Sequence, residues 1–354
     1  MARALCALFF LSGAAALLFE TLWFRLAGLS LGNSVWASSI VLASLMAGLA
    51  LGNLAAARWG GAVRNPVRAY GVLEVVCGAG GLGLVLLFPV LAPFAASVLG
   101  PLAERPVPAN LARLAIAFAV LLVPTTAMGA TLPLLVRPLS RAAGFGPALG
   151  RLYGWNTLGA VAGPLAGELV LIPWLGIRGT GFVAGALNLA CGLGALALAT
   201  QAPSVPAHDE PRETLPARNT RPAAILAAAA LCGAAVLGLE VLWFRLMQLF
   251  VAGQSAIFAV MLAVVLLGIG LGGLAAGRWL ASAPSAFRWT PFVSLACGFL
   301  VQATYASFDQ ALAARGISFT GSVLDTLLLS LWLMLPVSAL SGLLFTLLGR
   351  ALEP

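Results

Sequence analysis

This sequence contains few charged residues. Only 8% of its 354 residues are charged, against roughly 25% in an ordinary soluble domain, while 61% are hydrophobic. So few ionisable side chains cannot cover the surface of a water-soluble protein of this size. Apolar runs of about 20 residues, long enough to cross a bilayer, recur along the chain. These features exclude a soluble globule and predict an all-α polytopic membrane protein whose first partner is the lipid bilayer.

Lysine is absent, and histidine and cysteine are scarce. The 19 basic residues are all arginines, and the net charge is +8. In such a chain this excess orients helices across the membrane, so we expect no nucleic-acid partner. The five cysteines lie singly in apolar runs, without the C-x-x-C spacing of a metal site. The one histidine, His208, lies in a polar stretch with four prolines. We therefore expect neither a metal site nor a cofactor.

Ten apolar stretches predict about ten transmembrane helices. They lie near residues 4–29, 35–57, 69–99, 111–136, 149–172, 177–200, 222–251, 255–277, 290–313 and 324–348. Residues 201–221 are polar and rich in proline, which predicts a linker that does not fold alone. The predicted domains are a six-helix first repeat at 1–200, a cytoplasmic linker at 201–221 and a four-helix second repeat at 222–354.

The arginines divide unequally between the two sides of the predicted membrane. Four lie in loops on the side opposite the N-terminus, namely Arg105, Arg113, Arg178 and Arg315, and two lie within spans, namely Arg25 and Arg245. The other thirteen share the side of the N-terminus. The positive-inside rule then predicts that both termini are cytoplasmic. We expect a multi-pass protein of the bacterial inner membrane.

The two halves of the chain repeat each other. A shift of 220 residues superposes GAAALLFETLWFRL (13–26) on GAAVLGLEVLWFRL (233–246), and GLALGNLAAARW (48–59) on GIGLGGLAAGRW (268–279), without a gap. The first span imitates a secretory signal peptide, but its pattern returns deep inside the chain, so we interpret it as a transmembrane helix. Because six helices separate the copies, both enter the membrane in the same sense, as in parallel major-facilitator-like repeats.

The second repeat is shorter than the first. PVSALSGLLFTLLGR (336–350) corresponds to PTTAMGATLPLLVR (124–137), and the chain ends four residues later. Nothing in the second half matches residues 149–200. We therefore expect a major-facilitator-like repeat whose second copy is truncated, with two helices missing or supplied by another chain.

Four passages carry a resemblance to a known family. They are E-x-x-W-x-R at Glu20 and again at Glu240, P-T-x-x-M-G-A-T-x-P from Pro124, G-x-x-Y-x-x-N-T-x-G-A from Gly150, and the glycine-rich helix that ends in Arg58. These motifs resemble the membrane portion of the fused spermidine synthases. The resemblance implies a major-facilitator-like bundle, which in the family precedes a cytosolic aminopropyltransferase-like domain. This sequence has no residues left for that domain, so we do not expect the chain to be an aminopropyltransferase by itself.

Six polar residues within the predicted spans are candidate substrate-binding residues. They are Glu20, Arg25, Glu240, Arg245, Glu168 and Asn156. A charged side chain near the bilayer centre costs roughly 2.5–3.5 kcal/mol on insertion scales, so its presence points to a function or to a partner. Five residues on a helix correspond to about 140° of rotation, so Glu20 does not face its own Arg25.

Two interpretations of these residues stay open. In one, pseudo-symmetry brings both Glu/Arg sets around a central cavity, where the carboxylates hold a cationic substrate or carry a proton. In the other, each glutamate pairs with a neighbouring helix, and each arginine reaches the headgroups beside Trp23 or Trp243 in an outer aromatic belt. Asn156 bonds either a helix backbone or a substrate. We expect Glu74 to pair with an arginine at the cytoplasmic end, namely Arg58, Arg64 or Arg68.

The predicted function is a transporter-like or substrate-channelling module of a spermidine-synthase-like protein, which handles a small cationic solute such as a polyamine. The alternative is a membrane anchor or partner subunit for a cytosolic aminopropyltransferase-like enzyme. A second copy of the chain is a further candidate partner. A membrane enzyme acting alone would need a nucleophile and base set or a metal-ligand cluster, which the sequence lacks.

Overall fold

The computed structural model describes residues 1–31, 35–143, 145–200, 222–251, 254–314, 316, 319 and 322–352. These residues form helices joined by short turns and loops. Seven helices among them are long and apolar enough to cross a membrane, or nine if each of two bent helix pairs is one span. The prediction of an all-α polytopic membrane protein is confirmed at this level.

The chain forms two compact units, Met1–Asp209 and Glu210–Pro354. Their boundary falls within the stretch 201–221, whose residues lie outside the described part of the chain.

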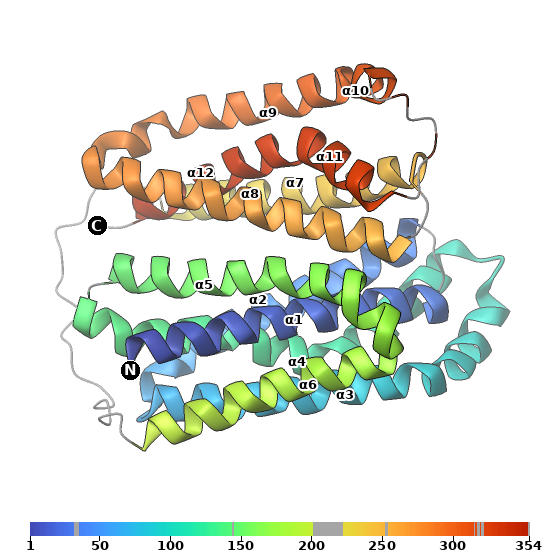
Figure 1. Cartoon of the computed structure of the whole chain (residues 1–354), viewed down its shortest axis with the longest axis horizontal. Helices are drawn as coiled ribbons and strands as arrows, with labels where there is room; N and C mark the ends of the chain where they lie inside the picture. Colours follow the sequence, from blue (N-terminus) through green and yellow to red (C-terminus); the bar gives the residue numbers. More distant parts are fainter. Residues whose placement is uncertain are drawn as a thin grey trace. The chain divides into compact units, whose positions relative to one another are not determined.

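The first unit contains six long helices. They are α1 (Ala2–Leu31), α2 (Val35–Trp59), α3 (Pro66–Leu99), α4 (Pro106–Ala143), α5 (Phe145–Ala166) and α6 (Ile172–Ala199). Successive helices run in opposite directions, so the start of α1 and the end of α6 share one end of the unit (Figure 1). Helix α3 begins there with a sequence-encoded cap, since Asn65 Oδ1 accepts a hydrogen bond from the Arg68 N–H and Pro66 occupies the first turn.

A sharp break separates α5 from α6. The apolar helical stretch Arg151–Ala199 has 49 residues, which would extend about 73 Å at 1.5 Å per residue, more than twice the hydrocarbon core of a bilayer. Within it, Gly167–Leu171 forms a π-helical turn, and Gly176 has a φ of 68° that a residue with a side chain rarely adopts. The chain then reverses, and α6 runs antiparallel to α5 (Figure 1). The break lies between the spans predicted near 149–172 and 177–200.

The second unit contains the remaining helices. They are α7 (Pro222–Gln248), α8 (Gln254–Ser282), α9 (Thr290–Ala306), α10 (Phe308–Ala314), α11 (Val323–Leu333) and α12 (Leu335–Leu352). Two of its candidate spans are bent. Ser285–Ala306 meets Phe308–Ala314 at 44°, and Val323–Leu333 meets Leu335–Arg350 at 47°.

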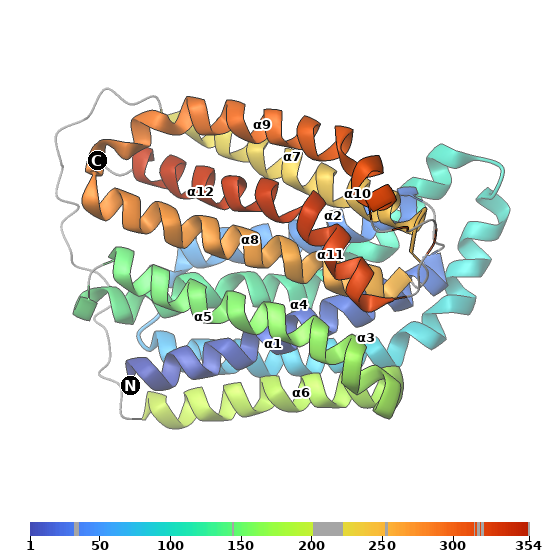
Figure 2. The same ribbon diagram turned by 45° about the horizontal axis from the view of Figure 1, so that its top comes forward.

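Glycines bring helix backbones into direct contact at α1, which lies between α5 and α6 (Figure 1, Figure 2). A Cβ atom added to Gly159 or Gly163 of α5 would lie 1.9 Å from the Phe10 carbonyl oxygen or 2.3 Å from that of Ala14. A Cβ on Gly13 of α1 would lie 2.2 Å from the Asn156 carbonyl oxygen. Only glycine fits at these three positions, and this is how lipid-embedded helices gain close packing.

Another close backbone contact is found in both units, at positions related by the repeat. It joins α2 to α4 in the first unit and α8 to α12 in the second. In the first unit, a Cβ on Gly52 of α2 would lie 2.0 Å from the Thr126 carbonyl oxygen of α4. In the second, a Cβ on Gly272 of α8 would lie 1.8 Å from the Ala339 carbonyl oxygen of α12, and Figure 2 shows these two helices side by side. The sequence repeat therefore has a structural counterpart in this helix pair.

A thiol contact confirms the register of this correspondence. Cys77 Sγ donates to the Pro124 carbonyl oxygen at 3.8 Å, and Cys297 Sγ donates to the Val337 carbonyl oxygen at 3.9 Å. The cysteines are 220 residues apart and the acceptors 213 apart. The end of the second unit thus matches the first with a shift of 213, so that Val337, and not Pro336, is the counterpart of Pro124.

The glycine contact between α8 and α12 predicts opposite effects of two alanine substitutions in α8. Gly272→Ala should lower the free energy of unfolding by about 1–3 kcal/mol, because its methyl group would overlap a backbone carbonyl. Gly277→Ala, the matched control, has no atom within 4 Å of the added Cβ and should raise stability by up to about 1 kcal/mol through helix propensity. Thermal unfolding of the detergent-purified chain measures both changes, and equal melting temperatures for the two variants would contradict the contact.

Candidate functional site

A cavity of about 170 Å³ with both apolar and polar lining residues lies in the first unit. All six long helices of the unit contribute side chains to it. Its polar lining residues are Ser12, Glu20, Glu74, Thr125, Thr131, Asn156 and Asn188. A buried cavity of about 150 Å³ is large enough to hold benzene in another protein, so this one has room for a molecule of similar size.

Glu74 of α3 is one of two carboxyl groups in the cavity. Its side chain is 1% exposed, and its Oε1 accepts a hydrogen bond of 2.6 Å from Ser12 Oγ of α1. The expected pairing of Glu74 with Arg58, Arg64 or Arg68 is therefore wrong. Two helical turns separate Glu74 from the start of α3 at Pro66. This depth places the carboxyl group in the helix bundle, away from the arginines at the helix end.

Glu20 of α1 is the second carboxyl group. Its Oε1 is buried and has no hydrogen-bond partner among the described residues. One turn further along α1, Trp23 is fully buried, stacks on Phe19 with ring centroids 5.4 Å apart and donates from Nε1 to the Gly81 carbonyl oxygen at 3.2 Å. Trp23 therefore fixes α1 against α3 and also lines the cavity.

The tryptophan positions correct one expectation. Trp23 and its repeat counterpart Trp243 were expected in an outer aromatic belt, but their side chains are 0% and 1% exposed within the described structure. Both are core residues. The E-x-x-W-x-R pattern resembles a belt motif in sequence because tryptophan suits both an interface and a tightly packed core, and sequence alone does not separate the two.

Two amide side chains complete the polar lining. Asn156 of α5 donates from Nδ2 to the Phe9 carbonyl oxygen of α1 at 3.1 Å, so it bonds a helix backbone and also lines the cavity. Asn188 of α6 is 1% exposed, and its Nδ2 has no hydrogen-bond partner among the described residues. A buried N–H without an acceptor is costly, so the Asn188 Nδ2 is a hydrogen-bond donor left open in the cavity.

The cavity unites two of the six predicted site residues, Glu20 and Asn156. Arg25 and Glu168 belong to the same unit, in α1 and in the π-helical turn, but they are not among the lining residues. Glu240 and Arg245 belong to α7 of the second unit, where Arg245 Nη1 donates to Gln248 Oε1 at 3.0 Å. The two Glu/Arg sets therefore belong to different units.

Sequence reasoning missed Ser12, Glu74 and Asn188 as site residues. Each is a polar residue inside an apolar span, which by itself marks a candidate functional position. Asn188 is the clearest omission, because it is the one amide in the apolar run of α6.

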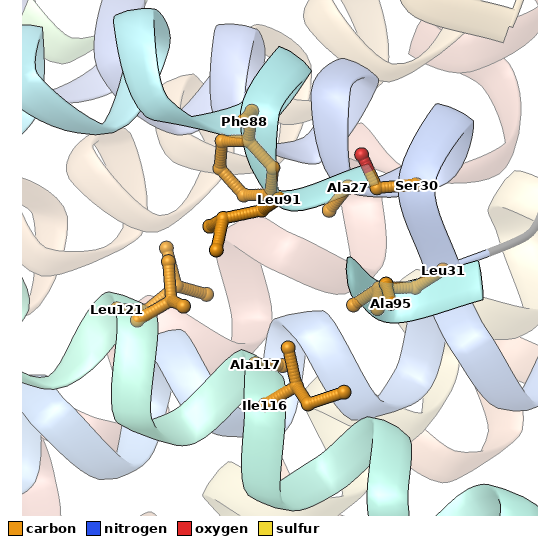
Figure 3. A pocket seen from close by; sticks show the side chains of 10 residues that line it. Ala27, Ser30, Leu31, Phe88, Leu91, Ala95, Ile116, Ala117 and Leu121 are labelled. Carbon is orange, nitrogen blue, oxygen red and sulfur yellow. The ribbon is translucent and has the colours of Figure 1, made fainter. Parts of the chain in front are cut away.

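A second hollow in the same unit contrasts with this cavity. It lies between α1, α3 and α4 and is lined by apolar side chains such as Phe88 and Leu121 (Figure 3). Its volume is about 10 Å³, which is close to the minimum for one water molecule. Its one hydroxyl, Ser30 Oγ, donates to the Leu26 carbonyl oxygen of its own helix. The hollow is a packing defect and offers no ligand site.

Comparison with known proteins adds no identification. No protein-family model matches the chain, and no curated protein matches its sequence. Among the described residues, no three His, Cys, Asp or Glu side chains group closely enough to hold a metal ion.

The hydrogen bond between Ser12 and Glu74 predicts a stability difference between two serine variants of α1. Ser12→Ala should lower the free energy of unfolding by about 1–3 kcal/mol, because it removes the hydrogen-bond donor of a buried carboxyl group. Ser30→Ala is the matched control, since that hydroxyl bonds only its own helix, and should change stability by less than about 1 kcal/mol. Thermal unfolding in detergent measures the difference, and a Ser12→Ala protein as stable as the parent would refute the contact.

Proposed function

We propose that the cavity of the first unit binds a small organic cation within the membrane, and that the chain is a transporter-like or substrate-channelling module. The observation that carries this proposal is the presence of two carboxyl groups in a cavity whose described lining residues include no basic side chain. An ionised carboxylate without a counter-charge is costly in such surroundings. A cationic guest supplies that counter-charge.

The polar and apolar side chains of the lining also match the two parts of an alkylammonium ion. An ammonium group has three N–H donors and no acceptor, which suits the unpartnered Glu20 Oε1. Leu17, Leu45 and Leu49 provide apolar surface for the methylene groups of the same guest. A polyamine-type amine is the solute that the resemblance to fused spermidine synthases implies, and its chemistry agrees with this lining.

The architecture supports a transport-like role. If Arg151–Ala199 is two spans that meet at Gly176, the number of candidate membrane spans rises from nine to ten. A parallel repeat with the backbone contacts described above is compatible with the major-facilitator-like arrangement. Within the first unit, Arg3 and Arg137 lie near the end shared by the α1 start and the α4–α5 junction. By the positive-inside rule this end, and with it the N-terminus, faces the cytoplasm of a bacterial inner membrane.

The alternative function is a membrane anchor or partner subunit for a cytosolic aminopropyltransferase-like enzyme, with a second copy of this chain as a further partner. It rests on the family resemblance. An anchor does not require a polar cavity with an unpartnered carboxyl oxygen, because such a group costs stability and contributes nothing to anchoring. For this reason the cavity favours the transport-like function.

Amine binding tests the proposal. The purified full chain in lipid nanodiscs should bind n-butylamine or 1,4-diaminobutane in isothermal titration calorimetry, and Glu20→Gln should weaken binding at least tenfold because it removes one counter-charge. Glu104→Gln, at an exposed position before α4, is the matched control and should bind like the parent.

The proposal fails if the parent protein binds neither amine. It also fails if Glu20→Gln and Glu104→Gln bind both amines equally well. If the parent protein binds neither amine but co-purifies with a soluble aminopropyltransferase, the anchor function replaces the proposed cation-binding function.

A further inference from the structure

The two carboxyl groups of the cavity raise a question of charge balance that the proposed function leaves open. Glu20 and Glu74 line the same cavity of about 170 Å³. A carboxylate in such a cavity lacks the solvation that bulk water provides, and two carboxylates in one cavity add two such charges. The surrounding protein must therefore supply positive charge, or the groups must carry protons.

The groups around the cavity supply no such charge. Tyr70 and Cys77 of α3 and Cys191 of α6 interact with Glu74, and they are neutral hydroxyl and thiol groups. Helices α2 and α4 contribute leucine, methionine and threonine side chains, and α5 contributes the amide of Asn156. None of these side chains is a cation at neutral pH.

The arginines of the first unit whose hydrogen bonds are given lie at the helix ends. Arg113 donates from Nε to the Leu31 carbonyl oxygen, and Arg137 donates from Nη1 to the Gly60 carbonyl oxygen. Arg25 is on α1 itself, about 140° around the helix from Glu20, and does not line the cavity. Among the described residues that line the cavity, none is an arginine.

Two polar atoms in the cavity, both unpaired within the described structure, leave hydrogen-bonding positions for a polar guest or for water. Asn188, 1% exposed, lines the cavity and has an Nδ2 donor without an acceptor, and Glu20 has an Oε1 acceptor without a donor, among the described residues. A donor and an acceptor that stay unpaired in one cavity are both satisfied by a polar guest or by water. Packing alone does not account for either.

We infer that cation binding in this cavity is an exchange against protons: the carboxyl groups of Glu20 and Glu74 are neutral when the cavity holds no cation, and a bound amine displaces one proton for each of its ammonium groups. This inference rests on the proposed function. In the exchange, each entering ammonium group keeps its own protons, one carboxylic acid O–H bond breaks, and its proton leaves to bulk water. Charge in the cavity is the same before and after the exchange.

The second unit does not repeat the carboxyl pair of Glu20 and Glu74. A shift of 220 residues places Glu240 opposite Glu20, but Cys232 stands opposite Ser12 and Ser294 opposite Glu74. The carboxyl pair and the Ser12 hydroxyl that bonds Glu74 therefore belong to the first unit alone. We expect one exchange site per chain.

Proton release on binding tests the inference. The full chain in nanodiscs, in weakly buffered solution with a pH indicator, is titrated with n-butylamine and with 1,4-diaminobutane. One proton per bound monoamine and two per bound diamine are expected. Glu74→Gln, which keeps a side-chain oxygen for the Ser12 hydroxyl, should release one proton with either amine. Glu104→Gln, at its exposed position, should behave like the parent.

The pH dependence of affinity gives an independent measurement. Because protons compete with the cation, binding of n-butylamine should weaken about tenfold for each unit by which pH is lowered, while the amine itself stays fully protonated. The diamine should weaken about a hundredfold per unit in the parent and tenfold in Glu74→Gln or Glu20→Gln.

Different outcomes overturn the proton exchange and the proposed cation site. Binding of both amines without proton release, and with an affinity independent of pH, overturns the exchange and leaves the proposed cation site in place. Two protons released by the diamine in Glu74→Gln would also overturn it, because Glu74 would then not be one of the exchanging groups. Absence of binding in the parent protein overturns the proposed function itself.

Discussion

Direct contact between helix backbones is the constraint on which the rest of the first unit depends. Gly13, Gly159 and Gly163 let α1 and α5 approach until a single added carbon would overlap a carbonyl group. At this separation the short side chain of Asn156 reaches the Phe9 carbonyl oxygen across the interface. The same approach fixes the height and rotation of α1, and with them the positions of Ser12, Glu20 and Trp23 around the cavity.

The sequence was informative where local chemistry decides the structure. Apolar run length predicted the helices, the prolines and polar residues of 201–221 predicted a linker where the two units divide, and the cost of burying charge singled out Glu20. It was misleading for Glu74, because the arginines near it in sequence lie at a helix end while Ser12 lies 62 positions away. Tertiary contacts over such separations leave no periodic signal, whereas Asn188 could have been found as the one amide in the apolar run of α6.

The two units share a repeat but differ in the polar residues at corresponding positions. Backbone contacts at Gly52 and Gly272 and the thiol contacts of Cys77 and Cys297 are common to both. These common features are packing features. The carboxyl group of Glu74 and the hydroxyl that bonds it occur only in the first copy, so the repeat has kept its framework while the polar lining has diverged.

The glycine contacts also determine which parts of the molecule are stiff. Between α2 and α4, and again between α8 and α12, carbonyl oxygens fill the space that side chains occupy in an ordinary helix interface. No layer of adjustable rotamers separates these backbones, so neither pair can slide or twist internally without steric overlap. Each helix pair must therefore move as one rigid body in any conformational change. Bending must then occur at other positions, such as the chain reversal at Gly176 near the start of α6.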